Sequence, residues 1–356
     1  MNRVLKKEIK IGNVLIGANH KIAIQSMTNT KTKDVASTLN QIISLINAGC
    51  DIVRVAVLDL DDAKAISLIK QTLKENGYDA PIVADIHFDY KLALAAIEAG
   101  ADKIRINPGN IDSEEHLKMI ADACKEKHIP IRIGVNGGSL PTKYVNEFGR
   151  NSKAMVKTMK EYVELFESFG FYDLVLSLKS SDVISTIEAY NLASSVFSYP
   201  LHIGITEAGT FTRGTVLASV GLGVLLHQGI GDTLRVSLTA EPVEEVKVAK
   251  EILSSLNLID KPILVSCPTC GRTQYDMIPL AYEIEKFLET LGDVKIKVAI
   301  MGCPVNGVGE AGDADIGVAG GKGEALLFKK GKVIRKIGED DIAEVLKKEI
   351  LEMIKK

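Results

Sequence analysis

The chain has 356 residues, of which 46% are hydrophobic and 25% are charged, and its formal net charge is -3. This balance excludes a protein that binds nucleic acid or an anionic membrane through overall basic charge, so any affinity for anions must be local. A chain of this length is expected to form one large domain and a smaller one. Neither the basic N-terminal segment nor the longest apolar run has the pattern of a signal peptide or a membrane span, so we expect a cytoplasmic protein.

Eight short runs rich in β-branched residues alternate with segments that carry apolar residues at helical spacing. The runs cover residues 21–27, 51–57, 81–86, 102–107, 130–135, 173–178, 200–205 and 233–238. Eight such units in about 240 residues predict an α/β fold with an N-terminal (β/α)8 TIM barrel. A doubly wound open sheet is the alternative, and the lack of a G-x-G-x-x-G motif after the first strand disfavours a dinucleotide-binding version of it.

The regular alternation stops near Lys261, where we place a domain boundary that gives a barrel over residues 1–260 and a second domain over residues 261–356. The second part is predicted to be a small α+β domain. Its expected elements are strands at 263–267, 294–302 and 315–321, a helix at 278–291, a hairpin at 324–337 and a final helix at 340–356.

Five of the barrel strands carry a cation within the strand or just after it. The neighbours of each arginine are apolar, so if these pack outward, strand alternation turns the cation toward the barrel axis. The cations could pair with acids such as Asp85 or Glu207, or lie on the surface. An unpaired buried cluster costs several kcal/mol per ion, which instead favours a phosphate or carboxylate ligand at the C-terminal face of the barrel. The five residues are Arg54, Arg105, Arg132, Lys179 and Arg235.

Polar residues at the same strand ends could orient substrate hydroxyls or the cations. Glu207, at the end of the seventh strand, could relay protons or act only as a counter-ion, and the sequence leaves both open. His202 lies early in its strand, where it fits a hydrogen-bonded core histidine as well as it fits a ligand. The other candidates are Asp85, His87, Asn107, Asn136 and Ser237.

Three of the five cysteines fall in the second domain: Cys267 and Cys270 form a C-x-x-C motif, and Cys303 follows in a loop rich in Gly and Pro. Structural zinc takes four Cys or His ligands, and no histidine follows His227. A thioredoxin-like pair leaves Cys303 without a role, whereas an iron–sulfur cluster uses all three thiolates. The fourth ligand stays open among Asp276, Glu310 and Asp313. Cys50 and Cys124 are interpreted as ordinary buried cysteines.

Motifs along nearly the whole chain resemble the bacterial 4-hydroxy-3-methylbut-2-enyl diphosphate synthase family of the non-mevalonate isoprenoid pathway. They are the opening "IKIGNVLIGANHKIAIQSMTNTKTKD", then "ADIHF", "IRINPGN", "RIGVNGGSL", "SLKSSD", "GITEAG", "SCPTCGRT" and "MGCPVNGVGEA". The resemblance implies an oxidoreductase whose barrel binds 2-C-methyl-D-erythritol 2,4-cyclodiphosphate. It also implies a C-terminal domain with a [4Fe-4S] cluster held by Cys267, Cys270, Cys303 and the replaceable carboxylate of Glu310.

The family reaction opens the cyclic diphosphate and removes a hydroxyl as water, consuming two electrons. The resemblance implies ferredoxin or flavodoxin as the electron donor, and a homodimer in which the cluster domain of one subunit caps the barrel of the other. We expect Glu207 to relay a proton beside the reacting carbon. Two rival interpretations are a barrel lyase or transferase for a phosphorylated or pterin-type substrate with a structural zinc domain, and a non-enzymatic redox sensor.

Overall fold

The structure, a computed structural model, describes residues 3–355, apart from the side chains of residues 305–307. The chain divides into two compact units, the first ending at Leu256 and the second beginning at Asn257. Each unit has a sheet of its own. No helix in the described part of the chain is long and apolar enough to cross a membrane.

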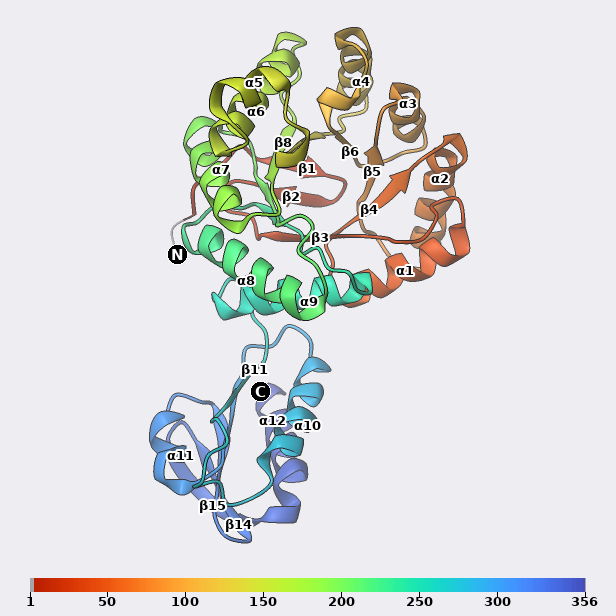
Figure 1. Cartoon of the computed structure of the whole chain (residues 1–356). Coiled ribbons are helices and arrows are strands. Elements are labelled where there is room, and N and C mark those ends of the chain that lie inside the picture. Colours follow the sequence, from red (N-terminus) through yellow and green to blue (C-terminus); the bar gives the residue numbers. More distant parts are fainter. Residues whose placement is uncertain (1–2, 356) are drawn as a thin grey trace. The chain divides into compact units, whose positions relative to one another are not determined.

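The first unit is built around eight parallel strands in the order β8-β7-β6-β5-β4-β3-β10-β9. A parallel bridge between Leu176 and Leu201 joins the two outermost strands, so the sheet closes on itself (Figure 1). This arrangement confirms the predicted (β/α)8 barrel. The strands are β3 (Ala23–Met27), β4 (Ile52–Val57), β5 (Ile82–Ile86), β6 (Lys103–Ile106), β7 (Ile131–Asn136), β8 (Leu174–Lys179), β9 (His202–Ile203) and β10 (Thr233–Leu234).

Helices connect the barrel strands and surround them (Figure 1). Side chains such as Asp59 and Ser113 accept backbone N–H bonds at helix starts. Gly49 and Gly100 follow two helix ends with positive φ, as their sequence positions indicated. The helices are α1 (Val35–Asn47), α2 (Leu60–Glu75), α3 (Tyr90–Glu98), α4 (Glu114–Glu126), α5 (Thr142–Phe148), α6 (Ser152–Ser168), α7 (Val183–Val196), α8 (Phe211–His227) and α9 (Pro242–Ser255), with short 3-10 turns η1 (Pro108–Asn110) and η2 (Gly137–Ser139).

An antiparallel hairpin of β1 (Ile9–Ile11) and β2 (Val14–Ile16) precedes the barrel, and the sequence did not predict it. Its strands have only three residues each, too few for a clear alternation pattern. The hairpin packs Ile9, Ile11 and Ile16 against residues near the N-terminal ends of four barrel strands, namely Ala23, Ile52, Val83 and Val175. These side chains form an apolar layer that closes the N-terminal end of the barrel.

The second unit is a five-stranded sheet in the order β11-β12-β13-β14-β15, with its first three strands parallel and its last two antiparallel. Helices α10 and α12 pack on one face of the sheet, and a smaller cluster containing Ala311 covers the other face (Figure 1). The elements are β11 (Ile263–Ser266), α10 (Met277–Glu289), β12 (Lys297–Met301), α11 (Pro304–Glu310), β13 (Ile316–Gly320), β14 (Glu324–Lys329), β15 (Lys332–Gly338), the turn η3 (Glu339–Asp341) and α12 (Ile342–Ile354).

Candidate active site

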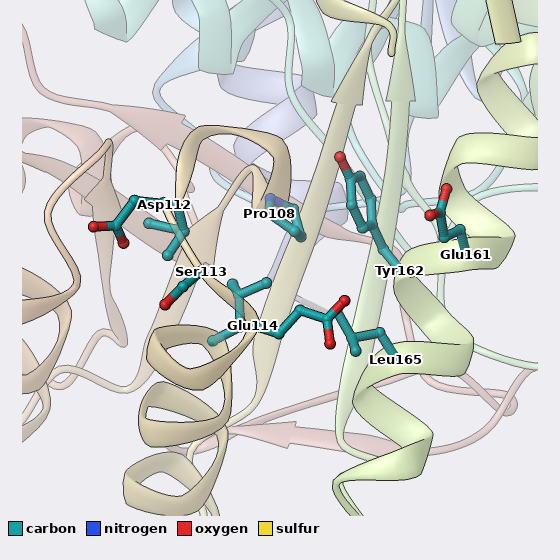
Figure 2. Close-up of a pocket in the computed structure, with 9 residues that line it drawn as sticks. Pro108, Asp112, Ser113, Glu114, Glu161, Tyr162 and Leu165 are labelled. Atoms are coloured by element: carbon teal, nitrogen blue, oxygen red, sulfur yellow. The ribbon is translucent and has the colours of Figure 1, made fainter. Parts of the chain in front are cut away.

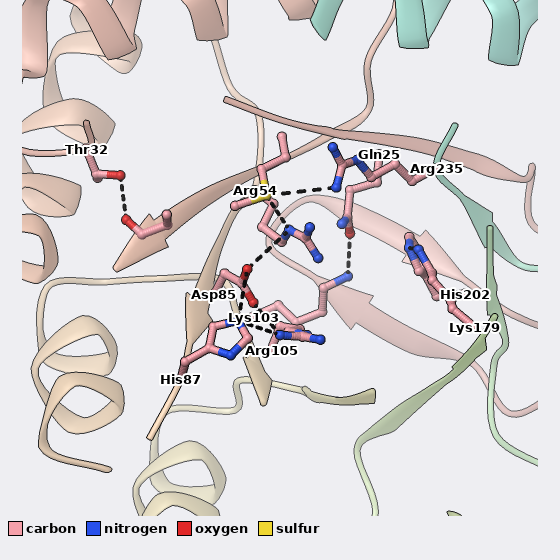
Figure 3. A network of polar contacts seen from close by, with 12 residues as sticks. Gln25, Thr32, Arg54, Asp85, His87, Lys103, Arg105, Lys179, His202 and Arg235 are labelled. Atoms are coloured by element: carbon pink, nitrogen blue, oxygen red, sulfur yellow. Dashed lines mark hydrogen bonds and ion pairs between the residues drawn. The ribbon is translucent and has the colours of Figure 1, made fainter. Parts of the chain in front are cut away.

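Four cations on separate barrel strands are almost fully buried. Arg54 on β4, Arg105 on β6, Arg132 on β7 and Lys179 on β8 are between 2% and 8% exposed. The residues on either side of each arginine are apolar and buried, so strand alternation turns the cations to the inside of the barrel. Figure 3 shows the labelled cations converging from different strands.

Asp85 on β5 lies between two of these cations. Its Oδ1 atom is 3.0 Å from Arg105 Nη1, and its Oδ2 atom is 3.9 Å from Arg54 Nε (Figure 3). Burial by itself would raise the pKa of Asp85, but the charges of Arg54 and Arg105 outweigh burial and hold that pKa well below its usual range. Arg105 Nη1 also lies 2.8 Å from His87 Nε2. Because a guanidinium only donates, this His87 nitrogen accepts the bond.

Arg235 is held by a carboxylate that the sequence analysis missed. Glu245 on α9 is 4% exposed and accepts from both Arg235 Nε and Arg235 Nη2 at 3.1 Å. It also accepts from Ser26 Oγ at 2.9 Å and from the Leu238 backbone N–H at 3.1 Å. This bidentate pair fixes the direction of the arginine.

Lys103, at the start of β6, is a second residue that the sequence analysis missed. It is fully buried, and its Nζ atom donates to Gln25 Oε1 at 3.2 Å across the barrel (Figure 3). Burial, together with the charges of Arg132 and Arg54, lowers the pKa of Lys103 well below its usual value. Strand alternation in the sequence could have identified this residue. Lys103 lies two residues before Arg105, so both side chains are on the same face of β6.

Positive charge exceeds negative charge in this interior. Among the described residues, the buried carboxylates that contact the cations are Asp85 and Glu245. Burial, only partly offset by Asp85, lowers the pKa of Arg54 to about 10. Arg132 Nε and Nη1 are buried without a hydrogen-bond partner among the described residues. Unpaired buried donors are costly, so this interior is suited to a polyanionic ligand. The cations are Arg54, Lys103, Arg105, Arg132, Lys179 and Arg235.

A cavity of about 290 Å³ opens beside Lys179, and Asn136 and Glu207 also line it. Glu207 is exposed at the rim and has a φ of 55°, a left-handed conformation that is strained for a residue with a side chain. Asn107 is buried, and its Oδ1 atom accepts from the Gly109 N–H at 3.2 Å, so it shapes its own loop. Ser237 is partly buried beyond β10.

A larger cavity of about 530 Å³ lies outside the strand barrel, between α4 and α6 (Figure 2). Three carboxylates line it, those of Asp112, Glu114 and Glu161, together with Tyr162. These acids would repel an anionic ligand. An anionic ligand is therefore expected in the cationic interior of the barrel and not in this cavity.

The predicted cysteine ligands occupy two loops of the second unit. Cys267 and Cys303 follow β11 and β12, which are adjacent parallel strands. Cys267 Sγ accepts from the Gly302 N–H at 3.1 Å, and Gln274 N donates to Gly302 O at 2.8 Å, so the loop containing Cys270 packs on the loop before Cys303. Within the described residues, no three His, Cys, Asp or Glu side chains converge closely enough to hold a metal ion.

Cys303 lies at a helix start, which corrects the predicted loop. It occupies the N-cap position of α11, and Pro304 takes the first turn, where proline is favoured because its missing N–H is not needed. Glu310 is the last residue of this helix, seven residues after Cys303. Cys303 precedes the helix in an extended conformation, and Glu310 follows it by about two helical turns, so one short helix links these two predicted ligands. In their chemistry, the three cysteine thiols and the Glu310 carboxylate are donors that suit an iron–sulfur cluster.

Two family models match the chain: the GcpE TIM-barrel domain over residues 6–250 and the GcpE protein C-terminal domain over residues 263–352. The chain belongs to the GcpE family. It is 53% identical over 356 residues to the 4-hydroxy-3-methylbut-2-en-1-yl diphosphate synthase (flavodoxin) of Clostridium perfringens, covering 99% of this chain and 100% of that one. The protein of the same name from Caldanaerobacter subterraneus is 53% identical over 355 residues, covering 99% and 98%.

Solved structures resemble the GcpE barrel in fold. The 3-dehydroquinate dehydratase of Geobacillus kaustophilus superposes with a TM-score of 0.53 at 14% identity, covering 72% of this chain and 98% of that one. Such low identity supports the barrel fold and carries no information on the reaction. The predicted family, its oxidoreductase class and the barrel with a separate C-terminal domain are confirmed by the GcpE matches and the named relatives.

Replacing Glu245 with glutamine should destabilise the barrel, because Arg235 would lose its counter-charge while it stays mostly buried. Breaking a buried pair in this way costs about 3–5 kcal/mol. The matched control is Glu244→Gln, which removes an exposed pair with Lys247 and should cost less than about 1 kcal/mol. Urea unfolding measures both. Equal losses in the two variants would contradict the role of Glu245.

Proposed function

We propose that the chain converts 2-C-methyl-D-erythritol 2,4-cyclodiphosphate to (E)-4-hydroxy-3-methylbut-2-enyl diphosphate, by reductive ring opening and loss of water, in isoprenoid precursor biosynthesis. The supporting observation is the cationic interior of a GcpE barrel, whose buried positive charge exceeds its negative charge. The second unit of the same chain also carries Cys267 and Cys270 in one loop and Cys303 at the start of α11. The named relatives are synthases of the same product. A lyase or transferase with a zinc domain is not favoured.

The barrel residues bind and orient the diphosphate in this proposal. The arginine guanidinium groups offer planar pairs of donors that suit phosphate oxygens. Asp85 keeps Arg54 and Arg105 in place, and Glu245 does the same for Arg235. The proposed substrate-binding residues are Arg54, Asp85, His87, Arg105, Asn107, Arg132, Asn136, Lys179, Arg235 and Ser237.

Glu207 is the proposed proton relay. Its position on the rim of the cavity beside Lys179, in a strained backbone conformation, is typical of a residue held for function. A carboxyl group there can take up a proton from solvent and pass it to the hydroxyl that leaves as water. The counter-ion role remains the alternative for this residue.

Cys267, Cys270, Cys303 and Glu310 are the proposed ligands of a [4Fe-4S] cluster, with Glu310 as the catalytic, replaceable ligand. When bound, the cluster would pass on the two electrons that the reaction consumes, and it would also supply a Lewis-acidic iron. We propose flavodoxin as the donor, since the relatives' names specify it. Ferredoxin is the alternative.

We also propose a homodimer in which the second unit of one subunit caps the barrel of its partner. Large apolar side chains are exposed at the C-terminal face of the barrel, where the chain leaves the strands and the helices begin. Exposed apolar groups gathered around a site favour a covering partner. These residues are Leu58, Leu60, Phe88, Ile184 and Phe211, between 46% and 74% exposed.

Iron analysis after anaerobic purification tests the ligand set. The wild-type protein should be brown, with about four iron atoms and four sulfides per chain. Cys270→Ser should lose most of the iron, because it removes one of the proposed thiolate ligands. Cys270 is exposed, so its replacement costs little packing and the loss would not reflect unfolding. Cys124→Ala, a buried cysteine in the first unit, should keep it. Stoichiometric zinc in the wild-type protein would exclude the reductive mechanism.

In Glu310→Ala, iron should be retained with an altered electron paramagnetic resonance spectrum and an altered response to substrate. An unchanged spectrum and response would show that Glu310 is not the fourth ligand.

Glu207→Gln should lower kcat for the cyclic diphosphate by about 10²–10⁴-fold, because the amide cannot transfer a proton. KM should change little, since the barrel cations are intact. Steady-state kinetics with a low-potential reductant gives both constants. Full turnover by this variant would leave only the counter-ion role.

Mixing two inactive variants tests the capping arrangement. Cys270→Ser lacks a working cluster, and Arg132→Met lacks a working barrel. In mixed dimers, capping across subunits pairs one intact barrel with one intact cluster, so random mixing should restore about a quarter of wild-type activity. No recovery, although mass spectrometry detects mixed dimers, would show that each chain uses its own second unit.

A further inference from the structure

A chain of buried polar groups lies beside Lys179. Lys179 ends β8, and its Nζ atom is 3.3 Å from Nε2 of His202, at the start of β9. His202 is fully buried in the barrel. Figure 3 shows the two side chains next to each other, apart from the network around Asp85. His202 therefore contacts a proposed substrate-binding residue without lying at the rim itself.

The imidazole of His202 is fixed on its other side as well. Its Nδ1 atom lies 2.7 Å from Thr233 Oγ1 on β10. The hydroxyl of Tyr190 donates to the His202 carbonyl at 2.6 Å and accepts from the Leu178 N–H at 3.1 Å. Burial, together with the charges of Arg132 and Lys179, lowers the pKa of His202 well below its usual value, so the ring is neutral.

Gly204 gives Lys179 its path to the histidine. A Cβ atom at Gly204 would lie 2.8 Å from Lys179 Nζ and 3.1 Å from Lys179 Cε. Any side chain there would push the lysine away from His202 Nε2. Because Gly204 has no side chain, the Lys179 amino group can occupy a defined position next to His202.

The neutral imidazole of His202, paired with the Thr233 hydroxyl, can form a hydrogen bond with Lys179 whether the lysine is charged or neutral. If Lys179 is charged, it donates to Nε2, and Nδ1–H donates to Thr233 Oγ1. If Lys179 is neutral, Nε2–H donates to the amine, and the threonine hydroxyl donates to Nδ1. Both arrangements use the same heavy-atom positions, so no side chain has to move.

We propose that His202 is a positioning residue for Lys179, and that with Thr233 it keeps Lys179 Nζ in one place at the barrel mouth whether the lysine is charged or neutral. The proposal rests on the proposed function, in which Lys179 binds the diphosphate. A bound anion favours the charged lysine, so binding is accompanied by proton uptake at Lys179. The charged groups that face the pair from the other strands are Arg54, Lys103, Arg105, Arg132 and Arg235.

Binding of inorganic diphosphate, measured by calorimetry between pH 6 and pH 10, tests this role without requiring turnover. Inorganic diphosphate also loses protons over this range, so each affinity is first corrected for ionisation of the ligand. The corrected wild-type affinity should fall as pH rises through the pKa of Lys179, which burial and the neighbouring cations lower. Thr233→Val keeps the side-chain volume but removes the hydroxyl that serves Nδ1 in both charge states. With the charged lysine this leaves a buried N–H donor without an acceptor, whereas with the neutral lysine it leaves only a ring lone pair without a donor. The first defect costs more, so the variant disfavours the charged lysine. The midpoint of this fall should move about half to one pH unit lower.

Two matched variants separate positioning from a structural effect. Thr233→Ser retains the hydroxyl and should restore the wild-type midpoint. Tyr190→Phe removes a hydrogen bond to the His202 backbone and should lower stability without moving the midpoint. An unmoved midpoint in Thr233→Val, or an equal shift in Tyr190→Phe, would overturn the proposal. If the midpoint moves in Thr233→Val and returns in Thr233→Ser, but the wild-type protein does not convert the cyclic diphosphate, the proposed function fails and the positioning role stands.

Discussion

The excess of buried positive charge inside the barrel is the constraint on which the rest of the site depends. Six cations converge there, and of the buried carboxylates that the structure describes, Asp85 and Glu245 contact them. Each carboxylate fixes the direction of an arginine, while Arg132 keeps buried donors without partners among the described residues. The site is organised in advance, and an anion with several oxygens would complete both its charge balance and its hydrogen bonds.

The barrel can hold this charge because its two ends differ. At the N-terminal end, the β1–β2 hairpin and apolar strand residues such as Ile52 and Val83 form a dry floor. Above it, the same strands present Arg54 and Asp85 to the interior. Removal from water strengthens the electrostatic interactions of the buried groups. Burial, together with neighbouring cations such as Arg132, also lowers the pKa values of Lys103 and His202.

The second unit presents a different chemistry. Cys267 and Cys303 follow adjacent parallel strands, and the Gly302 N–H donates to the Cys267 sulfur. Backbone N–H bonds to a ligand sulfur are a common way of orienting metal ligands. The proposed roles of the two units follow from their side chains. Guanidinium and ammonium groups in the first unit suit phosphate, and cysteine sulfur in the second unit suits iron.

The sequence by itself determined the eight strands, the inward-facing arginines and the three cysteines, because alternation and motif spacing are local properties of the chain. It left out Glu245, which resembles an ordinary acid in the first turn of a helix, and the α11 helix that begins after Cys303. Only the tertiary structure decided which groups meet: Glu245 with Arg235, and His202 with Lys179 and Thr233. Those contacts join residues on different elements, and closure of the barrel brings them together.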